Sequence, residues 1–566
     1  MKNYIIKGLA AVLVAGSLAS CSDDYLDVEP ITTLDESSAY MTVKGAELAL
    51  NGICRSMNTQ YQGITSTPNM NGESFFCTWY GEMLGSDAFY WVFSRYGGNT
   101  VLNWVNNTDA NGIIPGYSWR YPYNLIAQCN TILRGEDTAE GDTKERQSIM
   151  AQVRTIRAHA YIRLLQCFAP RWEDSNEGNV KCIVLRKERS TQDLPLSTMK
   201  EVLDFVYADL DKAIELYNAS GITSTSFIWR PSLSVAQGLY ARVAMIKHDY
   251  QKAQEMAHAA RQGHAIMTAD EYKGGFAEAN GEWMWANAAS DQIYYWAFGS
   301  WYACNGPYPT LWGYGAGAIN YDLARQIPTT DVRTGLYFTP KACEKYNLDT
   351  PAIGFWLSTW VNKTTMNCMG TGGKMTESLL RMSNLTIPNG DREKWGVPYT
   401  NRTGEEGGTR DQVVPFGAQF KFWCTDTYGA GQFPFMRAAE FLLTEAEAAY
   451  YNGDEATAKA CLNELLAKRN PGQTVTSTGN ALLDEIRLQR RIELWGEGHC
   501  FFDLKRWSLP MVRRAWVERD QQSGNIPSAY EVRKEVNDRG WTFVVPKSET
   551  QYNHAINADA TGSDNN

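Results

Sequence analysis

Residues 437–469, RAAEFLLTEAEAAYYNGDEATAKACLNELLAKR, predict two helices joined by a short turn. In the first half, apolar residues recur at intervals of three or four and therefore share one face of a helix. These residues are Ala439, Leu442, Ala446 and Ala449. The turn Asn452-Gly453-Asp454 follows, and a second helix carries Ala456 and Ala460. Small residues let two helices approach closely, so the stretch predicts a helical hairpin.

The same pattern occurs earlier, over residues 232–260. An apolar stripe over 232–246 is followed by a turn at 248–250 and by a second alanine-rich helix. The stripe residues are Ala236, Leu239, Val243 and Ile246 in the first helix, and Ala253, Ala257 and Ala260 in the second. Such pairs are the unit of a tetratricopeptide array. Because a long segment separates the two pairs, we expect an interrupted array and not a simple solenoid.

The intervening segment, residues 267–434, is rich in Gly, Asn, Thr and aromatic residues and poor in apolar stripes. This texture predicts loops with a few short strands, and residues 59–116 share it. The sequence therefore predicts a mainly α fold of tetratricopeptide-like helix pairs, with helical regions over 41–266 and 435–566 and a large loop-rich insertion over 267–434. Binding residues concentrate on loops that a rigid scaffold carries.

The N-terminus predicts export and lipid attachment. A positive start precedes an apolar run over 8–18, which is too short to cross a hydrocarbon layer of roughly 30 Å and is typical of a signal peptide. Leu18-Ala19-Ser20-Cys21 resembles a bacterial lipobox, which implies removal of residues 1–20 and lipidation of Cys21. Residues 21–40 begin with acids that resemble a cell-surface tag and are expected to form a tether. The alternative is a secreted protein with an incidental cysteine.

Composition narrows the function classes. The net charge of −10 argues against a nucleic-acid partner, which needs a basic patch. The chain has 12 cysteines and no C-x-x-C pair, so neither a zinc nor a redox site is expected, although a few disulfides are compatible with export. Cys167 and Cys461 lie in apolar helical stretches and are interpreted as small core residues.

Residues 490–507, RRIELWGEGHCFFDLKRW, carry the one arrangement that suggests catalysis. Glu493 and Glu497 lie one helical turn apart, but paired acids of glycosidases face each other across a cleft. Arg490 shares the helix face with Glu493, so we interpret the acids as structural and expect an Arg490–Glu493 ion pair. The chain contains no H-E-x-x-H, G-x-S-x-G or complete phosphate-loop motif, and we predict no catalytic residue, metal or cofactor.

Two aromatic clusters in loop-textured segments are the candidate ligand site. Five of the 19 tryptophans fall within residues 283–312, where even spacing would place about one, with tyrosines interleaved. Aromatic rings bury the apolar face of a sugar, while Asp, Asn and Arg side chains bind its hydroxyl groups. The predicted ligand-binding residues are Asp87, Tyr90, Trp91, Arg95, Asn99, Trp104, Trp296, Trp301, Tyr302, Trp312 and Tyr314. Trp119, Trp495 and Trp507 are instead expected to pack in the core.

Several segments together resemble the SusD/RagB family of surface glycan-binding lipoproteins. These are the lipobox, the stripe over 42–57, WRYPYNLIAQCNTIL at 119–133, RAAEFLLTEAEA at 437–448 and FVVPKSETQYN at 543–553. The most specific is 490–507, similar to R-R-x-E-L-x-x-E-G-x-R-x-x-D-L-x-R-W. Cys500 stands where that pattern has an arginine between the Glu-Gly and Asp-Leu pairs, which places one expected salt bridge in question.

The resemblance implies a lipid-anchored protein on the extracellular side of the outer membrane. Such a protein binds an oligo- or polysaccharide without cleaving it and caps a SusC-like TonB-dependent transporter. Three alternatives remain: a peptide-binding lid, a surface glycoside hydrolase, and a scaffold whose loops bind nothing. The sequence does not identify the glycan, nor does it establish whether calcium is bound.

Overall fold

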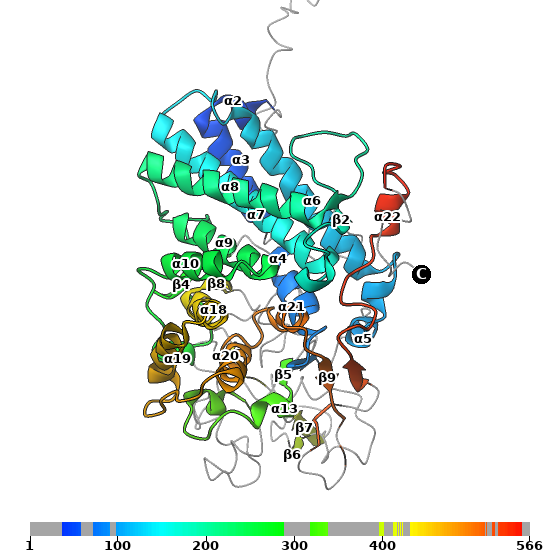
Figure 1. The fold of residues 1–566 in the computed structure, drawn as a ribbon, viewed down its shortest axis with the longest axis vertical. Helices are drawn as coiled ribbons and strands as arrows, with labels where there is room; N and C mark the ends of the chain where they lie inside the picture. The colour runs from blue at the N-terminus through cyan, green and yellow to red at the C-terminus, as the bar shows by residue number, and fades with distance from the viewer. Residues whose placement is uncertain are drawn as a thin grey trace, which may run out of the picture.

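The computed structural model describes residues 37–57, 72–90, 98–287, 317–337, 396–400, 411–415, 417, 419, 421–422, 431–515, 517, 523–526 and 530–556 (Figure 1). The predicted signal peptide, Cys21 and most of the predicted tether lie outside these residues. Helices dominate the described part, as the periodic stripes predict.

Five helices form the part of the molecule drawn at the top of Figure 1. They are α2 (Ser38–Met41), α3 (Val43–Ser56), α6 (Ile113–Ile132), α7 (Thr143–Phe168) and α8 (Met199–Ser220). Helix α7 is buried along most of its length because α3, α6, α8 and α9 all pack against it. A capping box of Thr198 and Glu201 begins α8, and Gly221, at φ +69°, ends it in the left-handed conformation.

Two helix pairs confirm the predicted hairpins. They consist of α9 (Leu233–Lys247) with α10 (Tyr250–Ala260), and α18 (Ala438–Tyr451) with α19 (Glu455–Arg469). His248 and Gly453 adopt positive φ in the turns, and the Asp249 and Asp454 side chains cap the helices that follow. On α19, however, the packed face is Ala458, Cys461 and Leu462, whereas Ala456 and Ala460 are exposed.

The two pairs stack directly on each other, although the insertion separates them in the chain. Helix α10 packs against α18, and Ala253 shares a buried cluster with Ala244 and Ala448. The described scaffold is therefore a stack of helix pairs, continued by α20 (Asn480–Glu493), whereas α21 (Cys500–Arg506) packs against the segment over 76–82.

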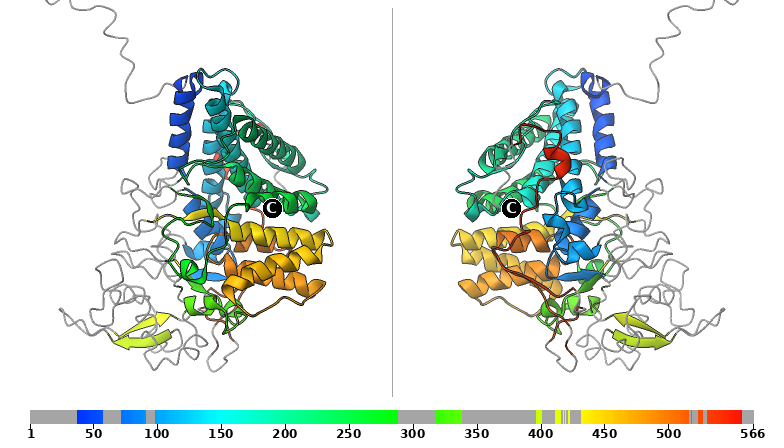
Figure 2. Two further views of the ribbon diagram at one scale, coloured as in Figure 1. Left: turned by 90° about the vertical axis from the view of Figure 1, so that its left-hand side faces the viewer. Right: turned by 90° about the vertical axis from the view of Figure 1, so that its right-hand side faces the viewer.

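The strands of the described residues are short and form five two-stranded antiparallel sheets. The pairs are β1 (Ala88–Tyr90) with β5 (Gly317–Ile319), β2 (Lys181–Ile183) with β3 (Ser197–Thr198), β4 (Trp283–Ala286) with β8 (Pro434–Arg437), β6 (Gly396–Thr400) with β7 (Asp411–Pro415), and β9 (Met511–Arg513) with β10 (Val532–Lys534). Because the strands of the described residues are short and the main helices are long, the predicted mainly α fold is confirmed. Figure 2 shows the β6–β7 hairpin and helices α18 to α20 on opposite sides of the molecule.

Short helical turns complete the architecture. They are α4 (Gly72–Phe75), the π-helical η2 (Phe76–Glu82), α5 (Gly98–Leu102), η4 (Asn106–Thr108), η5 (Leu133–Gly135), η6 (Trp172–Asp174), α11 (Ala269–Tyr272), α13 (Tyr321–Ala324), η7 (Val332–Leu336) and α22 (Lys547–Thr550).

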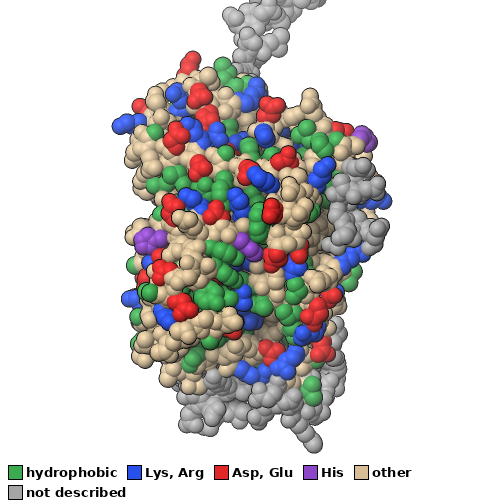
Figure 3. Space-filling view, in the orientation of Figure 1, with side chains coloured by type: hydrophobic (Ala, Val, Ile, Leu, Met, Phe, Trp, Pro, Cys, Tyr) green, Lys and Arg blue, Asp and Glu red, His purple; other side chains and the backbone are tan. Residues whose placement is uncertain are grey.

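The core and surface agree with several compositional predictions. Cys167 and Cys461 are buried free thiols, and Trp119, Trp495 and Trp507 are buried in the core. Acidic and basic side chains are interspersed on the face drawn in Figure 3. No helix within the described ranges combines the length and apolar character needed to span a bilayer.

Candidate functional site

Strands β1 and β5 bring together the points at which the two predicted ligand segments join the described fold. Their register pairs Ala88 with Ile319 and Tyr90 with Gly317. The chain leaves β1 toward Trp91, and it enters β5 directly after the segment that carries Trp296 to Tyr314. Because the two strands are antiparallel, both segments connect to the same end of this small sheet.

Backbone contacts also join distant parts of the loop-rich insertion to each other. The backbone of Ile319 donates to the carbonyl of Gly417 (2.8 Å), and Tyr337 forms an isolated bridge with Gln419. Strand β4, near the start of the insertion, pairs with β8, at its end, and β8 leads directly into α18 of the scaffold.

Asp87 anchors the start of β1 and lies in the core, not on the ligand face. It is 1% exposed, and its carboxylate accepts two hydrogen bonds from Arg491, one of 2.9 Å from Nε. Its backbone carbonyl accepts from Trp495 Nε1 (2.8 Å) and from the backbone of Asn320 (2.9 Å). Arg491 supplies the opposite charge that the buried Asp87 carboxylate requires, and burial keeps Asp87 away from a surface site. The prediction that Asp87 contacts a ligand is thereby corrected to a supporting role.

Trp104 is likewise a core residue. It is 3% exposed, its Nε1 donates to the carbonyl of Leu84 (3.0 Å), and its ring meets Trp541 and Phe501 edge-on at centroid distances of 4.8 and 5.5 Å. Such aromatic packing is favourable by itself and leaves no face for a sugar. Its predicted ligand contact is corrected accordingly.

The structure describes only the backbone of two other predicted contacts, Tyr90 at the end of β1 and Asn99 in α5. The remaining predicted contacts lie outside the described residues: Trp91, Arg95, Trp296, Trp301, Tyr302, Trp312 and Tyr314. Of the other tryptophans in the dense cluster, Trp283 and Trp285 on β4 are buried.

A buried ion cluster centred on Glu493 joins the insertion to the scaffold. The Glu493 carboxylate accepts two bonds from Arg469 (both 3.0 Å), one from Arg437 Nη1 (2.9 Å) and one from Arg333 Nη1 (3.2 Å). Arg469 ends α19, Arg437 ends β8, and Arg333 belongs to η7 of the insertion. All four side chains are at most 1% exposed, so these charges are shielded from bulk solvent and depend on one another for compensation.

Glu497 extends the cluster to Lys421. Its carboxylate accepts from Arg437 Nε (2.7 Å) and from Lys421 Nζ (2.6 Å). Lys421 also donates to the backbone carbonyls of Glu493 and Trp495. All three ammonium hydrogens therefore have acceptors, as a buried ammonium requires.

The charges in this cluster shift the pKa values of its members. Burial opposes ionisation of Glu493, but Arg469, Arg437 and Arg333 outweigh it and hold its pKa well below the usual range. Burial likewise opposes ionisation of Glu497, and Arg437 and Lys421 lower its pKa. Burial lowers the pKa of Lys421 to about 8. The two carboxylates are thus ionised anchors and not proton donors.

The motif 490–507 pairs differently from the expectation. Arg490 does not meet Glu493: its Nε donates to Asp503 (2.7 Å) and its Nη1 to Thr444 (3.1 Å). The expected Arg490–Glu493 pair is wrong because Glu493 turns toward the insertion. The structural interpretation of the two acids still holds.

Cys500 occupies the position at which the resembled motif has arginine. The thiol is buried against Gly85, where a Cβ atom would lie 2.6 Å from Cys500 Sγ, and burial raises its pKa well above the ordinary value. Arg491, the second residue of the motif, supplies the guanidinium that binds Asp87.

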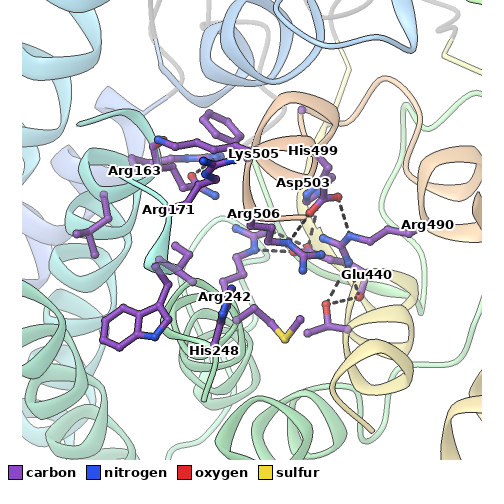
Figure 4. A pocket seen from close by; sticks show the side chains of 18 of the residues that line it. Arg163, Arg171, Arg242, His248, Glu440, Arg490, His499, Asp503, Lys505 and Arg506 are labelled. Carbon is purple, nitrogen blue, oxygen red and sulfur yellow. Dashed lines mark hydrogen bonds and ion pairs between the residues drawn. The ribbon is translucent and has the colours of Figure 1, made fainter. Parts of the chain in front are cut away.

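A charged pocket lies between α7, α9, α18 and α21 (Figure 4). Its two carboxylates are engaged by arginines: Arg242 binds Glu440 (both contacts 2.6 Å), and Arg490 binds Asp503. Burial, and then Arg490, hold the pKa of His499 well below its usual range. Both carboxylates of the pocket are therefore already bound by arginine side chains of the protein. The described residues bring together no group of three His, Cys, Asp or Glu side chains suited to a metal.

The Glu493–Glu497 ion cluster and the Asp87–Arg491 pair together form what we call the junction. Its cations, which sequence reasoning missed, are Arg491, Arg437, Lys421 and Arg333. Two of them had a usable signal, because Arg491 lies within the specific motif and Arg437 begins a predicted helix segment. Lys421 and Arg333 lie in loop-textured sequence, where no periodicity marks a buried cation.

Two family models match parts of this chain. Residues 419–561 match a family model described as the SusD family, and residues 24–245 match one described as starch-binding associating with outer membrane. No curated protein matches the chain.

Solved structures share the fold over nearly the full length. A SusD-like carbohydrate binding protein from Bacteroides vulgatus is 20% identical, with a TM-score of 0.68 over 92% of this chain and 98% of that one. A SusD superfamily protein from Bacteroides thetaiotaomicron is 19% identical, with a TM-score of 0.65 over 91% and 99%. One from Bacteroides fragilis is 17% identical, with a TM-score of 0.63 over 92% and 99%.

Proposed function

Because the chain belongs to the SusD family, a family of carbohydrate-binding proteins associated with the outer membrane, we propose that it binds an oligo- or polysaccharide at the cell surface without cleaving it. It then passes the glycan to a SusC-like TonB-dependent transporter. Lipid on Cys21 and the tether over 21–40 hold it on the extracellular side of the outer membrane.

The observation that carries this proposal is the pairing of β1 with β5. Tyr90 and Gly317 are partners in that register; one aromatic-rich segment begins directly after Tyr90, and the other ends directly before Gly317. The Asp87–Arg491 ion pair joins the start of β1 to α20. A rigid base under two aromatic segments supports one ligand surface to which both contribute.

Binding without hydrolysis is supported by the state of the motif's acids. Glu493 and Glu497 are buried and bound to arginines, so neither is available to protonate a glycosidic oxygen. The aromatic segments offer apolar platforms, which hold sugars with modest affinity per site.

Affinity electrophoresis of residues 22–566 through gels containing starch, xylan or mannan tests this function. We expect retardation by at least one polysaccharide, without release of reducing ends. Trp91→Ala and Tyr314→Ala should each weaken the retardation roughly tenfold, equivalent to about 1.4 kcal/mol. Tyr451→Ala is the control, because Tyr451 is 37% exposed on the helical scaffold.

Three results would overturn the proposal. Co-purified peptides without glycan retardation would favour a peptide-binding lid. Released reducing ends that one Asp or Glu substitution abolishes would establish a hydrolase. Equal effects of Tyr451→Ala and Trp91→Ala would remove the loop segments as the binding surface.

A further inference from the structure

A groove separate from the charged pocket of Figure 4 lies where α8 ends and α9 begins. Figure 1 shows these two helices. The α8–α9 loop, the start of α9, the end of α10 and β4 line it, and it encloses about 530 Å³. This volume falls within the roughly 300–1,000 Å³ typical of small-ligand sites. None of the predicted ligand residues contributes to its described lining.

One wall of this groove carries the exposed ring of Phe227, which packs against the half-buried ring of Trp229. Phe227, which lines the groove, is 48% exposed, and its ring lies 5.0 Å from that of Trp229 at an interplanar angle of 33°. Thr225 Oγ1 accepts from the backbone N–H of Phe227 (2.9 Å), and Arg230 donates its backbone N–H to the carbonyl of Phe227 (2.9 Å). An apolar ring held rigidly in solvent is unfavourable by itself and suits a ligand with a flat apolar face.

Polar side chains surround this ring on the other walls. Gln237 and the hydroxyl groups of Ser232 and Ser234 line the groove, and the two serine oxygens lie 2.8 Å apart. Trp283 also lines it, and among the described residues no acceptor lies within hydrogen-bonding distance of Trp283 Nε1. Because Trp283 is only 3% exposed, the polar groups among these that a ligand in the groove can reach are those of Gln237 and the two serines.

The groove is close to neutral. Of the described lining residues, Arg230 alone carries a formal charge, and its guanidinium binds Gln152 (2.7 Å) and Glu47 (3.2 Å). Burial lowers the pKa of His264, so its ring is uncharged at neutral pH. These walls match a neutral, hydroxyl-rich ligand better than an anion or a basic peptide.

The groove is also connected to the strand that leads into the aromatic segment. The backbone N–H of Ala286 donates to the carbonyl of Ile228 (3.1 Å), and Trp285 Nε1 donates to that of Trp229 (3.1 Å). Both donors belong to β4, whose next residues begin the segment that carries Trp296 and Trp301.

We propose that this groove is a second binding site for a neutral oligosaccharide, so that a polymer held by the loop segments also contacts the helical scaffold. The identity of the ligand as a glycan rests on the proposed function, whereas the location of the site rests on the groove itself. Two linked contacts on one chain increase avidity without requiring strong binding at either.

The test uses residues 22–566 and whichever of starch, xylan or mannan retards the wild-type protein. Phe227→Ala should weaken retardation by about tenfold through lost avidity. Ile222→Ala is the matched control: Ile222 lies in the same loop, is 39% exposed and does not line the groove. Gln237→Ala is the second variant, and thermal unfolding verifies that all three are folded.

Hydrogen exchange supplies a position-specific readout. A saturating oligosaccharide of the same glycan should slow exchange over 223–234 in the wild-type protein, and less so in Phe227→Ala. If Trp91→Ala abolishes retardation while Phe227→Ala and Gln237→Ala match Ile222→Ala and 223–234 is not protected, the second site is wrong and the proposed function stands. If no polysaccharide retards the wild type, both are overturned. Protection of 223–234 by peptides alone would also overturn the second site.

Discussion

The interface between the two helix pairs and the junction beneath β1–β5 are held by opposite means. At the first, small apolar residues such as Ala253 and Ala448 meet, and Arg261 binds Glu445 at the rim, 17% exposed. At the second, fully buried charges on Glu493, Arg437 and Arg333 meet across segments far apart in the chain.

This difference indicates which part of the molecule tolerates side-chain substitutions without a large loss of stability. Apolar helix faces tolerate many side chains of similar volume, whereas a buried charge depends on its partner. Within the motif 490–507, Glu493 and Glu497 bind Arg333 and Lys421 of the insertion and so attach it to the scaffold.

Removing one cation from the junction should have the largest effect. Arg437→Met leaves Glu282, Glu493 and Glu497 with fewer partners in a buried site, and we expect a loss of about 3–5 kcal/mol in the free energy of unfolding. Arg261→Met at the helix-pair interface should cost less, about 1–2 kcal/mol, because Glu445, although only 5% exposed, still binds His258 after the change. Urea denaturation of both variants measures the difference.

Equal losses in the two variants would contradict the contrast between the regions. A larger loss in Arg261→Met would show that the helix-pair interface, and not the ion cluster, is the sensitive part.

Backbone packing gives a second, smaller contrast. In η2, a Cβ atom on Gly81 would lie 2.1 Å from the carbonyl oxygen of Gly498, so Gly81→Ala must displace the motif and should destabilise by about 1–3 kcal/mol. In α3, a Cβ on Gly52 would meet nothing within 4 Å, so Gly52→Ala should stabilise by about 0.5–1 kcal/mol. Opposite shifts in thermal midpoint are expected, and a stabilised Gly81→Ala would refute the close approach.

The helical scaffold could be predicted because its signals are local. The stripes in 232–260 and 437–469 repeat every three or four residues, and turn residues such as Gly453 mark the boundaries. The sequence predicted an interrupted array of helix pairs, and the stacking of α10 on α18 across the insertion is a finding of the structure.

The junction could not be predicted because its partners have no fixed spacing. Lys421 and Glu497 are 76 residues apart, and Asp87 and Arg491 are 404 apart. Trp104 misled the interpretation for a related reason: an aromatic residue among Asp and Asn has the same composition whether the cluster binds a sugar or packs against Trp541 and Phe501.

Glu82, a buried carboxyl group whose pKa is affected by Asp87, gives a contrast of a different kind, visible as a change of stability with pH. Burial raises its pKa from 4.5 to about 8, Asp87 adds to the shift, and the backbone N–H groups of Gly498 (2.7 Å) and His499 (3.3 Å) only partly offset it. Between these two pH values the folded protein binds more protons than the unfolded chain. This group alone therefore lowers stability by about 1.4 kcal/mol for each unit of rising pH.

Glu82→Gln removes the charge and keeps the shape, so the stability of the variant relative to wild type should rise steadily from pH 5.5 to 7.5. Carboxylates whose pKa is lowered, such as Glu493, titrate below this window, and Lys421, with its pKa lowered to about 8, contributes above it. Glu215→Gln is the control, because Glu215 is solvent-exposed and pairs with Lys212 on the surface of α8. A difference between Glu82→Gln and wild type that does not change with pH would mean that Glu82 is ionised at the junction, and that its buried carboxylate is balanced as fully as that of Glu493.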